Sequence, residues 1–255
     1  MSFNIRHGKG MDEKIDLKRV AMVIQDQDAD LVGLQEVSGL MFWSGFINQM
    51  KRLGRITGYP YYCYYPNLKT LLGGLGNGVL SKFPIISSYN QVLISSKEPR
   101  GAVIGIIDLG YGKIKFINTH LGLVEEERVE QVNEILDTIK KEDKAILVGD
   151  FNASPDKLEI KKVIKRGLKD IFVECREKNL LEPDVTTKMG YTFAYRSKHP
   201  DVRIDYIFAG KNIQPLRFKV INSSASDHLP VLAEVKLSSN KHKYSNSGWG
   251  EVINK

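Results

Sequence analysis

Cysteine is scarce in this sequence, and its two cysteines do not stand in a metal-binding pattern. Cys63 and Cys175 can form at most one disulfide, and neither a C-x-x-C pair nor an H-E-x-x-H motif occurs. We therefore expect both thiols to be reduced. A structural or catalytic zinc site has little support.

Long apolar runs are also absent. Stretches such as residues 102–107 are interrupted by glycine or charge, far short of the roughly 20 residues that a membrane-spanning helix needs. The first seven residues include Asn4, Arg6 and His7, where a secretory signal would be apolar. These absences favour a soluble, cytoplasmic protein without a transmembrane segment. Export stays open if the true start lies upstream of Met1.

Charge of one sign is only in modest excess. Lys and Arg number 37 against 30 for Asp and Glu, which gives a net charge of +7, and part of the surplus lies in the tail at Lys241, Lys243 and Lys255. Such a dispersed surplus favours solubility over a nucleic-acid footprint, so nucleic acid is only one of the open partners. With 42% hydrophobic residues, the chain can bury a sizeable core, and disorder is excluded.

Two similar helix–strand units frame the sequence. Asp16, followed by apolar residues at helical spacing, predicts a helix over about residues 16–27, and the same spacing predicts a second helix over 126–141. Short buried strands follow at 31–34 and 145–148, and they close on Gln35-Glu36 and Gly149-Asp150. Other strands are expected at residues 61–65, 78–81, 85–93, 102–108, 113–120, 204–209, 216–221 and 229–237.

Domain organisation is simple. Residues 1–237 contain no linker rich in Pro, Gly or Ser, so we predict a single catalytic domain over 1–238 and a flexible C-terminal tail over 239–255. Mixed strands with a few outer helices favour an α/β (α+β) layered sandwich. We expect a monomer.

Polar residues follow the apolar part of one strand after another. Each alone could cap a turn, but burying several carboxylates without a cation or a shared proton would cost on the order of several kcal/mol each. Their oxygens suit Mg²⁺ or Mn²⁺. The imidazoles are free for proton transfer or phosphate contact. The set is Asn4, Glu36, Asn118, His120, Asp150, Asn152, Asp205, Asp227 and His228.

Five short motifs make the pattern recognisable. In chain order they are Leu34-Gln35-Glu36, Asn118-Thr119-His120-Leu121, Gly149-Asp150-Phe151-Asn152, Arg203-Ile204-Asp205-Tyr206 and Ser226-Asp227-His228-Leu229-Pro230-Val231. Residues 1 to about 237 thereby resemble the endonuclease/exonuclease/phosphatase superfamily, typified by deoxyribonuclease I and exonuclease III. The resemblance implies a four-layer αββα sandwich and Mg²⁺-dependent cleavage of phosphoester bonds.

The resemblance also implies roles for the site residues. Glu36 resembles the principal metal ligand, with Asn4 and Asp227 close to the same metal. Asp150 looks like the residue that positions or deprotonates the attacking water, and Asn152 like a phosphate holder. His228 resembles the imidazole that contacts the phosphate, and Asp205 resembles the carboxylate that orients this imidazole. His120, with Asn118 beside it, stands where a second catalytic histidine is found in some branches of the family.

Other candidates are less specific. Asn77 stands in a turn of small residues, Trp43 in a loop after Glu36 that could form a substrate lip, and Arg100 before a strand where it reaches phosphate or merely marks a turn. Residues 72–78 are rich in glycine, but no Lys-Ser/Thr follows, so a nucleotide P-loop is disfavoured.

The substrate is left open by the sequence. Thr119-His120 stands where abasic-site endonucleases usually carry Pro-Asn, which disfavours DNA repair. A nuclease, a lipid or inositol phosphoesterase and a small-molecule phosphodiesterase stay as alternatives. A non-catalytic binding module on the same fold is the rival from a different class, but the complete set of site residues argues against it.

Overall fold

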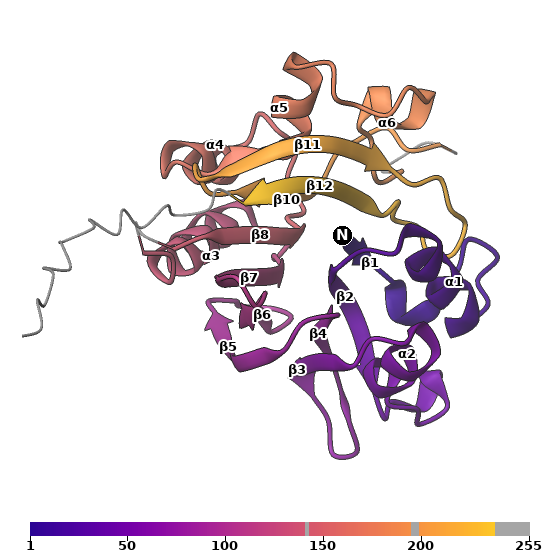
Figure 1. Ribbon diagram of the computed structural model, residues 1–255. Helices are drawn as coiled ribbons and strands as arrows, with labels where there is room; N and C mark the ends of the chain where they lie inside the picture. Colours follow the sequence, from indigo (N-terminus) through magenta and orange to yellow (C-terminus); the bar gives the residue numbers. More distant parts are fainter. Residues whose placement is uncertain (141–142, 195–198, 238–255) are drawn as a thin grey trace, which may run out of the picture.

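The β-rich stretches pair into two six-stranded sheets in the computed structural model, which describes residues 1–140, 143–194 and 199–237 (Figure 1). The first sheet has the order β11-β12-β1-β2-β4-β3, and the second has the order β5-β6-β7-β8-β10-β9. The strands of the first sheet are β1 (Ser2–Asn4), β2 (Leu31–Gly39), β3 (Tyr61–Lys69), β4 (Gly74–Ser81), β11 (Ile213–Val220) and β12 (Val231–Leu237). Those of the second sheet are β5 (Ile85–Leu93), β6 (Arg100–Asp108), β7 (Lys113–His120), β8 (Ala145–Asp150), β9 (Lys169–Asp170) and β10 (Asp205–Ala209).

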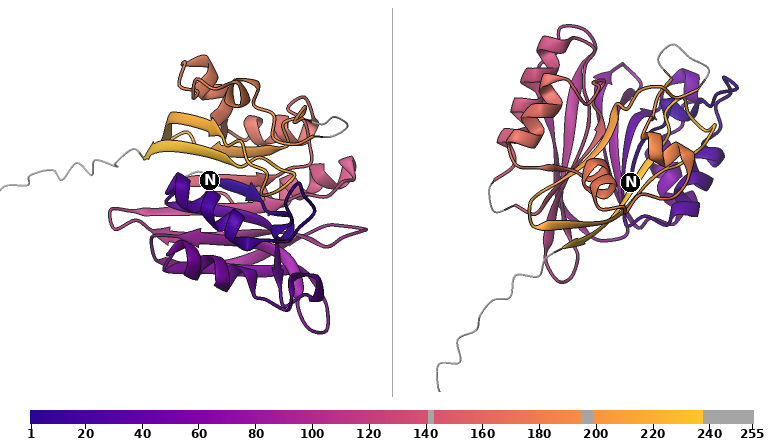
Figure 2. Two further views of the ribbon diagram at one scale, coloured as in Figure 1. Left: turned by 90° about the vertical axis from the view of Figure 1, so that its right-hand side faces the viewer. Right: turned by 90° about the horizontal axis from the view of Figure 1, so that it is seen from above.

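Helices cover the outer faces of both sheets, so the molecule has the four expected layers (Figure 2). Helices α1 and α2 lie on the first sheet, and α3 and α4 lie on the opposite side against the second sheet. Two short helices, α5 and α6, contact β11. The α-helices are α1 (Leu17–Gln27), α2 (Gln49–Thr57), α3 (Glu125–Asp137), α4 (Leu158–Lys165), α5 (Ile171–Glu177) and α6 (Val185–Met189), and the two 3₁₀ turns are η1 (Arg6–Gly8) and η2 (Phe42–Ser44).

The first predicted helix forms for the reasons that its sequence gives. The Asp16 carboxylate accepts a hydrogen bond from the Lys18 N–H and caps α1. Val20 and Ile24 are fully buried against the first sheet, and the helix ends at Asp28 in the left-handed region. The second predicted helix ends earlier than expected, at Asp137 instead of residue 141, and residue 141 itself lies outside the described residues.

The two helix–strand units place their functional strands side by side and in the same direction. β2 runs parallel to β1, and β8 runs parallel to β7, each joined through the helix that lies between them in the chain. The carboxyl ends of these strands therefore lie at one end of the sandwich. That end carries the polar residues that the sequence singled out.

The expectation that the strand at residues 31–34 ends on Gln35-Glu36 is wrong. β2 continues to Gly39, and its pairing with β4 shifts register between Leu34 and Val37. Glu36 has a φ of 53°, so the strand bulges there. A bulge re-aims a side chain without ending the strand, and this is how a carboxylate reaches the site from within β2.

Three apolar clusters hold the layers together, and the middle one lies between the sheets. One polar residue crosses this middle core. Asn118 of β7 donates to the carbonyls of Leu34 (2.9 Å) and Gly78 (2.8 Å) and accepts from Gln35. Gly33 leaves room for it, because a Cβ there would stand 2.9 Å from the Asn118 side chain and 2.6 Å from Val148. The sheets therefore approach closely just below the polar end.

Within the described ranges, none of the helices is long and apolar enough to span a membrane. A cytoplasmic location and a monomeric state stay predictions. The predicted tail over 239–255, and with it the domain boundary at 238, lies outside the described residues.

Candidate active site

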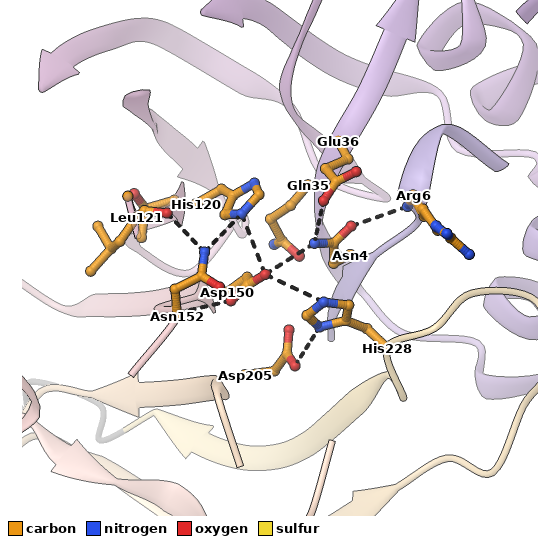
Figure 3. A network of polar contacts seen from close by, with 12 residues as sticks. Asn4, Arg6, Gln35, Glu36, His120, Leu121, Asp150, Asn152, Asp205 and His228 are labelled. Carbon is orange, nitrogen blue, oxygen red and sulfur yellow. Dashed lines mark hydrogen bonds and ion pairs between the residues drawn. The ribbon is translucent and has the colours of Figure 1, made fainter. Parts of the chain in front are cut away.

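Six side chains from both sheets meet at the polar end of the sandwich (Figure 3). Their contacts form one network that has Asp150 at its centre. The contributing positions are Asn4 at the end of β1, Glu36 in the β2 bulge, His120 at the end of β7, Asp150 at the end of β8, Asp205 at the start of β10 and His228 just before β12. Residues up to 224 positions apart in the chain, Asn4 and His228, are thus brought together by the order of the strands and by the bulge in β2.

Asp150 is 1% exposed and touches groups from three directions. Its Oδ2 accepts from the Asn4 amide at 3.0 Å and lies 3.4 Å from His120 Nε2 and 3.6 Å from His228 Nε2. The preceding Gly149 has a φ of 149°, and a Cβ there would overlap the Thr119 carbonyl. Only glycine lets β8 approach β7 so closely, and this approach seats Asp150 beside His120.

His228 is held as a cation. Its Nδ1 lies 2.9 Å from Asp205 Oδ2, so the other ring nitrogen points at Asp150. Burial alone would lower the pKa of His228, but the carboxylates of Asp205 and Asp150 outweigh it and raise that pKa to about 10. The Phe193 ring packs on the imidazole at 4.6 Å between centroids. The positive charge therefore has a fixed position and orientation.

His120 has the opposite electrostatic setting. The guanidinium of Arg100 lies 3.3 Å from Nδ1, and a guanidinium can only donate, so Nδ1 accepts and the ring proton sits on Nε2, toward Asp150. Burial and the Arg100 charge lower the pKa of His120 to about 3, despite the opposing effect of Asp150. The Asn152 amide nitrogen lies 3.1 Å from the same Nε2, but both groups are donors in this tautomer, and the amide donates to the Leu121 carbonyl instead. His120 is a neutral donor at pH 7.

Glu36 and Asp150 approach the same amide from opposite sides. Asn4 Nδ2 is 3.0 Å from Glu36 Oε1 and 3.0 Å from Asp150 Oδ2, while Asn4 Oδ1 accepts from the Arg6 backbone N–H. Burial raises the pKa of Glu36, and the negative charge of Asp150 adds to the effect. A half-buried carboxylate, Glu36, and a buried one, Asp150, therefore share one corner of the site with a single amide between them.

Comparisons with known proteins identify the family of this chain. A model of the endonuclease/exonuclease/phosphatase family matches residues 1–228. The chain belongs to this family. No curated protein matches the sequence significantly.

Solved structures of the same fold include a phosphatase and a protein bound to a DNA product. An endonuclease/exonuclease/phosphatase from Beutenbergia cavernae DSM 12333 has a TM-score of 0.74 at 24% identity, over 92% of this chain and 70% of its own. A mannosyl-6-phosphatase from Bacteroides thetaiotaomicron VPI-5482 has a TM-score of 0.71 at 21% identity, over 92% and 98% of the two chains. TDP2 from D. rerio, complexed with a single-strand DNA product, has a TM-score of 0.68 at 17% identity, over 92% and 97%. At these identities the likeness shows a shared fold.

In this endonuclease/exonuclease/phosphatase protein, two of the expected metal neighbours have other partners. Asp227 Oδ2 lies 3.3 Å from Arg6 Nε, and Asp227 Oδ1 accepts from Ser226 Oγ. Asn4 presents its amide nitrogen, not its oxygen, to the two carboxylates. The structure therefore brings Glu36 and Asp150 together through Asn4 and places Asp227 beside them, in an ion pair with Arg6.

The expected substrate contacts are also distributed differently. Asn118 is fully buried with its amide occupied by protein groups, which favours a structural role over phosphate contact. Asn77 donates to the Gly101 carbonyl at 2.9 Å and lines a small depression shared with Arg100. Trp43 lies in η2 instead of an irregular loop, donates to Ser38 Oγ and has its ring edge toward His7. Asn77 was expected in a turn of small residues, but it lies within β4.

The donor set of this family member fits a divalent cation. Enzymes of the family generally depend on such a metal. Asp150, Asp205 and His228 offer atoms within 4.8 Å of one another, but the Asp205–His228 bond ties two of them together. Within the described residues the Glu36 carboxylate accepts from Asn4, and its pKa is raised first by burial and then by the charge of Asp150, an environment in which a bound cation would stabilise the carboxylate.

Sequence reasoning missed the residues that support His228 from behind. Phe193 pairs with His228 in an isolated β-bridge, and Thr192 Oγ1 accepts from the backbone N–H groups of Ile204 and Asp205. Both belong to a segment between α6 and β10 without a helical or strand pattern. Only the long-range pairing reveals their position, so no local signal could have found them.

Proposed function

We propose that this protein is a phosphoesterase that depends on a divalent metal, Mg²⁺ or Mn²⁺, and hydrolyses its substrate by attack of water. One observation carries the proposal: a buried carboxylate, Asp150, lies between a neutral and a charged imidazole and next to a second carboxylate, Glu36. This is the donor and acceptor set that in-line attack on a phosphoester needs.

Asp150 is the group that orients the attacking water and accepts its proton. Its Oδ1 is fixed by the Asn152 N–H at 2.9 Å, and its Oδ2 is held by Asn4. A carboxylate fixed at both oxygens can align a water before the reaction, which lowers the entropic barrier. Asn152 is proposed to hold the phosphate from the other side through its own amide.

His228 meets the negative charge that develops on the phosphate oxygens. Its cationic state is secured by Asp205, so no proton needs to arrive at the moment of reaction. A preorganised positive group in a site shielded from water stabilises the transition state more than it would in water. Asp205 orients His228 and is a positioning residue.

His120 contributes a hydrogen bond from Nε2 to the leaving oxygen. Because its pKa is lowered to about 3, it acts as a neutral donor, not as an imidazolium acid. Arg100 fixes this tautomer through Nδ1 and adds positive charge behind the ring. Loss of either His120 or Arg100 would slow the departure of the leaving oxygen.

Glu36 is the residue proposed to hold the metal, oriented by Asn4, with Asp227 nearby. When bound there, the cation polarises the phosphoester and helps to offset charge on the leaving oxygen. The substrate is proposed to be a phosphoester, and its organic group stays open. The fold neighbours include both a mannosyl-6-phosphatase and a protein with a DNA product.

Chelation tests the proposal directly. Hydrolysis of bis(p-nitrophenyl) phosphate and of p-nitrophenyl phosphate should disappear in excess chelator and return with Mg²⁺ or Mn²⁺. Glu36→Gln should abolish the metal response, whereas the surface variant Glu130→Gln should behave as the wild type. Full activity in excess chelator would sink the metal mechanism. A panel of nucleic acids, phospholipid head groups and sugar or inositol phosphates then identifies the substrate class.

A further inference from the structure

Exposed apolar side chains gather on two turns of the first sheet. One turn, residues 40–46, follows β2 and includes η2, and the other, residues 70–73, joins β3 to β4 at the bottom of the molecule in Figure 1. Leu71 in the second turn is 99% exposed. The other exposed members of this apolar turn patch are Leu40, Phe42, Phe46 and Leu72. A gathering of this kind on a protein surface marks an interaction site.

The two turns lie against each other. The Thr70 hydroxyl of the second turn donates to the sulfur of Met41 in the first, at 3.6 Å. A Cβ at Gly73 would overlap the carbonyl oxygen of Gly39, so only glycine lets the turns approach so closely. The apolar turn patch is therefore one joined surface, although its two halves are about thirty residues apart in the chain.

The apolar turn patch lies near the active site. Leu40 comes four residues after Glu36, where β2 ends. The second turn leads into β4, whose Asn77 lines a small depression together with Glu36 and His120. At about 3.4 Å per residue, each turn stands within roughly 17 Å of these site residues. A partner bound at the patch would therefore lie close to the site.

The stretch that carries both turns has no acidic residue. Residues 37–97 contain no Asp or Glu, whereas their basic residues are Lys51, Arg52, Arg55, Lys69, Lys82 and Lys97. Lys51 and Arg52 lie near the start of α2, a few residues after the first turn, and Lys69 directly precedes the second. All three are exposed, and none has an ion-pair partner among the described residues. The protein itself leaves this positive charge uncompensated.

This combination of chemistry favours one class of partner. A second copy of the chain would bring the same cations face to face. Nucleic acid bases bind to aromatic rings or hydrogen-bonding groups, and the side chains of Leu71 and Leu72 offer neither. A narrow turn also lacks the area of about 800 Å² per partner that a stable protein interface buries. A phospholipid bilayer accepts apolar tips at its acyl boundary and attracts cations to its anionic head groups.

We propose that the apolar turn patch docks the protein on a membrane surface that carries anionic phospholipids. Leu71, Leu72 and the exposed rings of the first turn enter the acyl boundary, while Lys51, Arg52 and Lys69 lie among the head groups. The docking is peripheral, and it goes beyond the phosphoesterase activity without resting on it.

Sedimentation of the full chain with lipid vesicles tests the proposal. Vesicles of phosphatidylcholine with about 30 mol% phosphatidylserine should bind the protein about 100-fold more tightly than vesicles of phosphatidylcholine alone. Leu71→Ser/Leu72→Ser should weaken binding to the mixed vesicles about 10-fold, because less apolar surface is buried. Lys51→Gln/Arg52→Gln/Lys69→Gln should weaken it about 100-fold. The two lipid compositions are compared on the wild type and need no variant.

Two control variants make the same chemical changes on other surfaces. Tyr111→Ser/Ile164→Ser removes two exposed apolar side chains, and Lys161→Gln/Lys165→Gln/Lys211→Gln removes three exposed cations. Both should bind the mixed vesicles within about twofold of the wild type, because a docking site is local whereas net charge is not. Circular dichroism checks the fold of every variant.

Four results would overturn the proposal. The first is no binding of the wild type to the mixed vesicles, and the second is an equal loss in the patch variants and their controls. Unchanged binding of Leu71→Ser/Leu72→Ser would leave only electrostatic adsorption. A dimer in sedimentation velocity that the same variant abolishes would make a second copy the occupant. All of these outcomes are read from binding, so the membrane docking and the proposed hydrolysis fail independently.

Discussion

The site holds a histidine at the same depth on two sides, at the end of β7 and just before β12, and one imidazole is neutral whereas the other is a cation. His120 is 8% exposed and His228 is 6% exposed, and both ring Nε2 atoms lie near the same oxygen of Asp150. Behind His120 stands the guanidinium of Arg100, and behind His228 stands the carboxylate of Asp205. Burial lowers the pKa of both rings, so the group behind each ring accounts for the difference between them.

Removing the shared carboxylate or the charged imidazole is the most severe way to break this comparison. His228→Gln and Asp150→Asn should each lower turnover by about 10³-fold, because they remove preorganised charge at the phosphate and the proton acceptor for water. Steady-state kcat on a phosphoester measures this, and circular dichroism checks the fold. The exposed His199→Gln is the matched control. Wild-type turnover in His228→Gln would show that the site is assigned wrongly.

A smaller and more selective effect should separate the two imidazoles. His120→Ala should slow an alkyl phosphoester about 10²-fold more than a nitrophenyl ester, because an alkoxide needs help to leave and a nitrophenolate does not. Asp150→Asn should slow both substrates alike. The ratio of the two rates in each variant is the measurement. Equal losses in His120→Ala would make His120 a positioning residue.

The pH dependence of stability sharpens the contrast. The raised pKa of His228 means that its stabilising contribution is complete below pH 6.5 and is lost as pH rises toward 10. The lowered pKa of His120 means the reverse, because folding resists its protonation and stability is lost as pH falls from 6.5 toward 3. The midpoint temperature of thermal unfolding of the wild type should therefore decrease both below and above neutral pH.

Single substitutions should flatten one side at a time. His120→Gln should reduce the acid-side loss only, and Asp205→Asn should reduce the alkaline-side loss only, as measured by thermal unfolding from pH 4 to pH 10. The same slopes in both variants and in the wild type would mean that other groups govern the pH dependence.

The smallest effect is expected far from both histidines. Deletion of residues 239–255 should change kcat by less than about twofold, since every group of the proposed mechanism lies within residues 1–237. The measurement is kcat of the shortened chain beside that of the wild type. Loss of activity on this deletion would place a required group in the C-terminal residues.

Local pattern predicts the edge at which the site lies, but it does not predict the atoms that meet there. Apolar runs that end in Glu36, His120 and Asp150 indicate one shared end, because parallel strands bring their carboxyl ends together. The bulge that re-aims Glu36 depends on pairing with β4, which no window of sequence contains. In the same way, the amide orientation of Asn4 depends on two carboxylates from other strands.

The layered α/β arrangement was predictable for a related reason, whereas the number of layers came from the resemblance to the family. Helical spacing after Asp16 and strand spacing around Ala145 are local, and they agree with the layers that form. Residues of irregular segments that contact the site show no such periodicity in the sequence. Phe193 is an example, because only its bridge to His228 gives it a place in the site.

The hydrogen atom that serves as the side chain of Gly33 has a consequence for the reaction. Gly33 lies three residues before Glu36 in β2, and it faces Val148, two residues before Asp150 in β8. The separation of the two carboxylates is therefore set by how closely two independent sheets can seat against each other at this point. A methyl group at Gly33 would act as a spacer between the halves of the reaction centre, and it would alter catalysis from a position that no substrate touches.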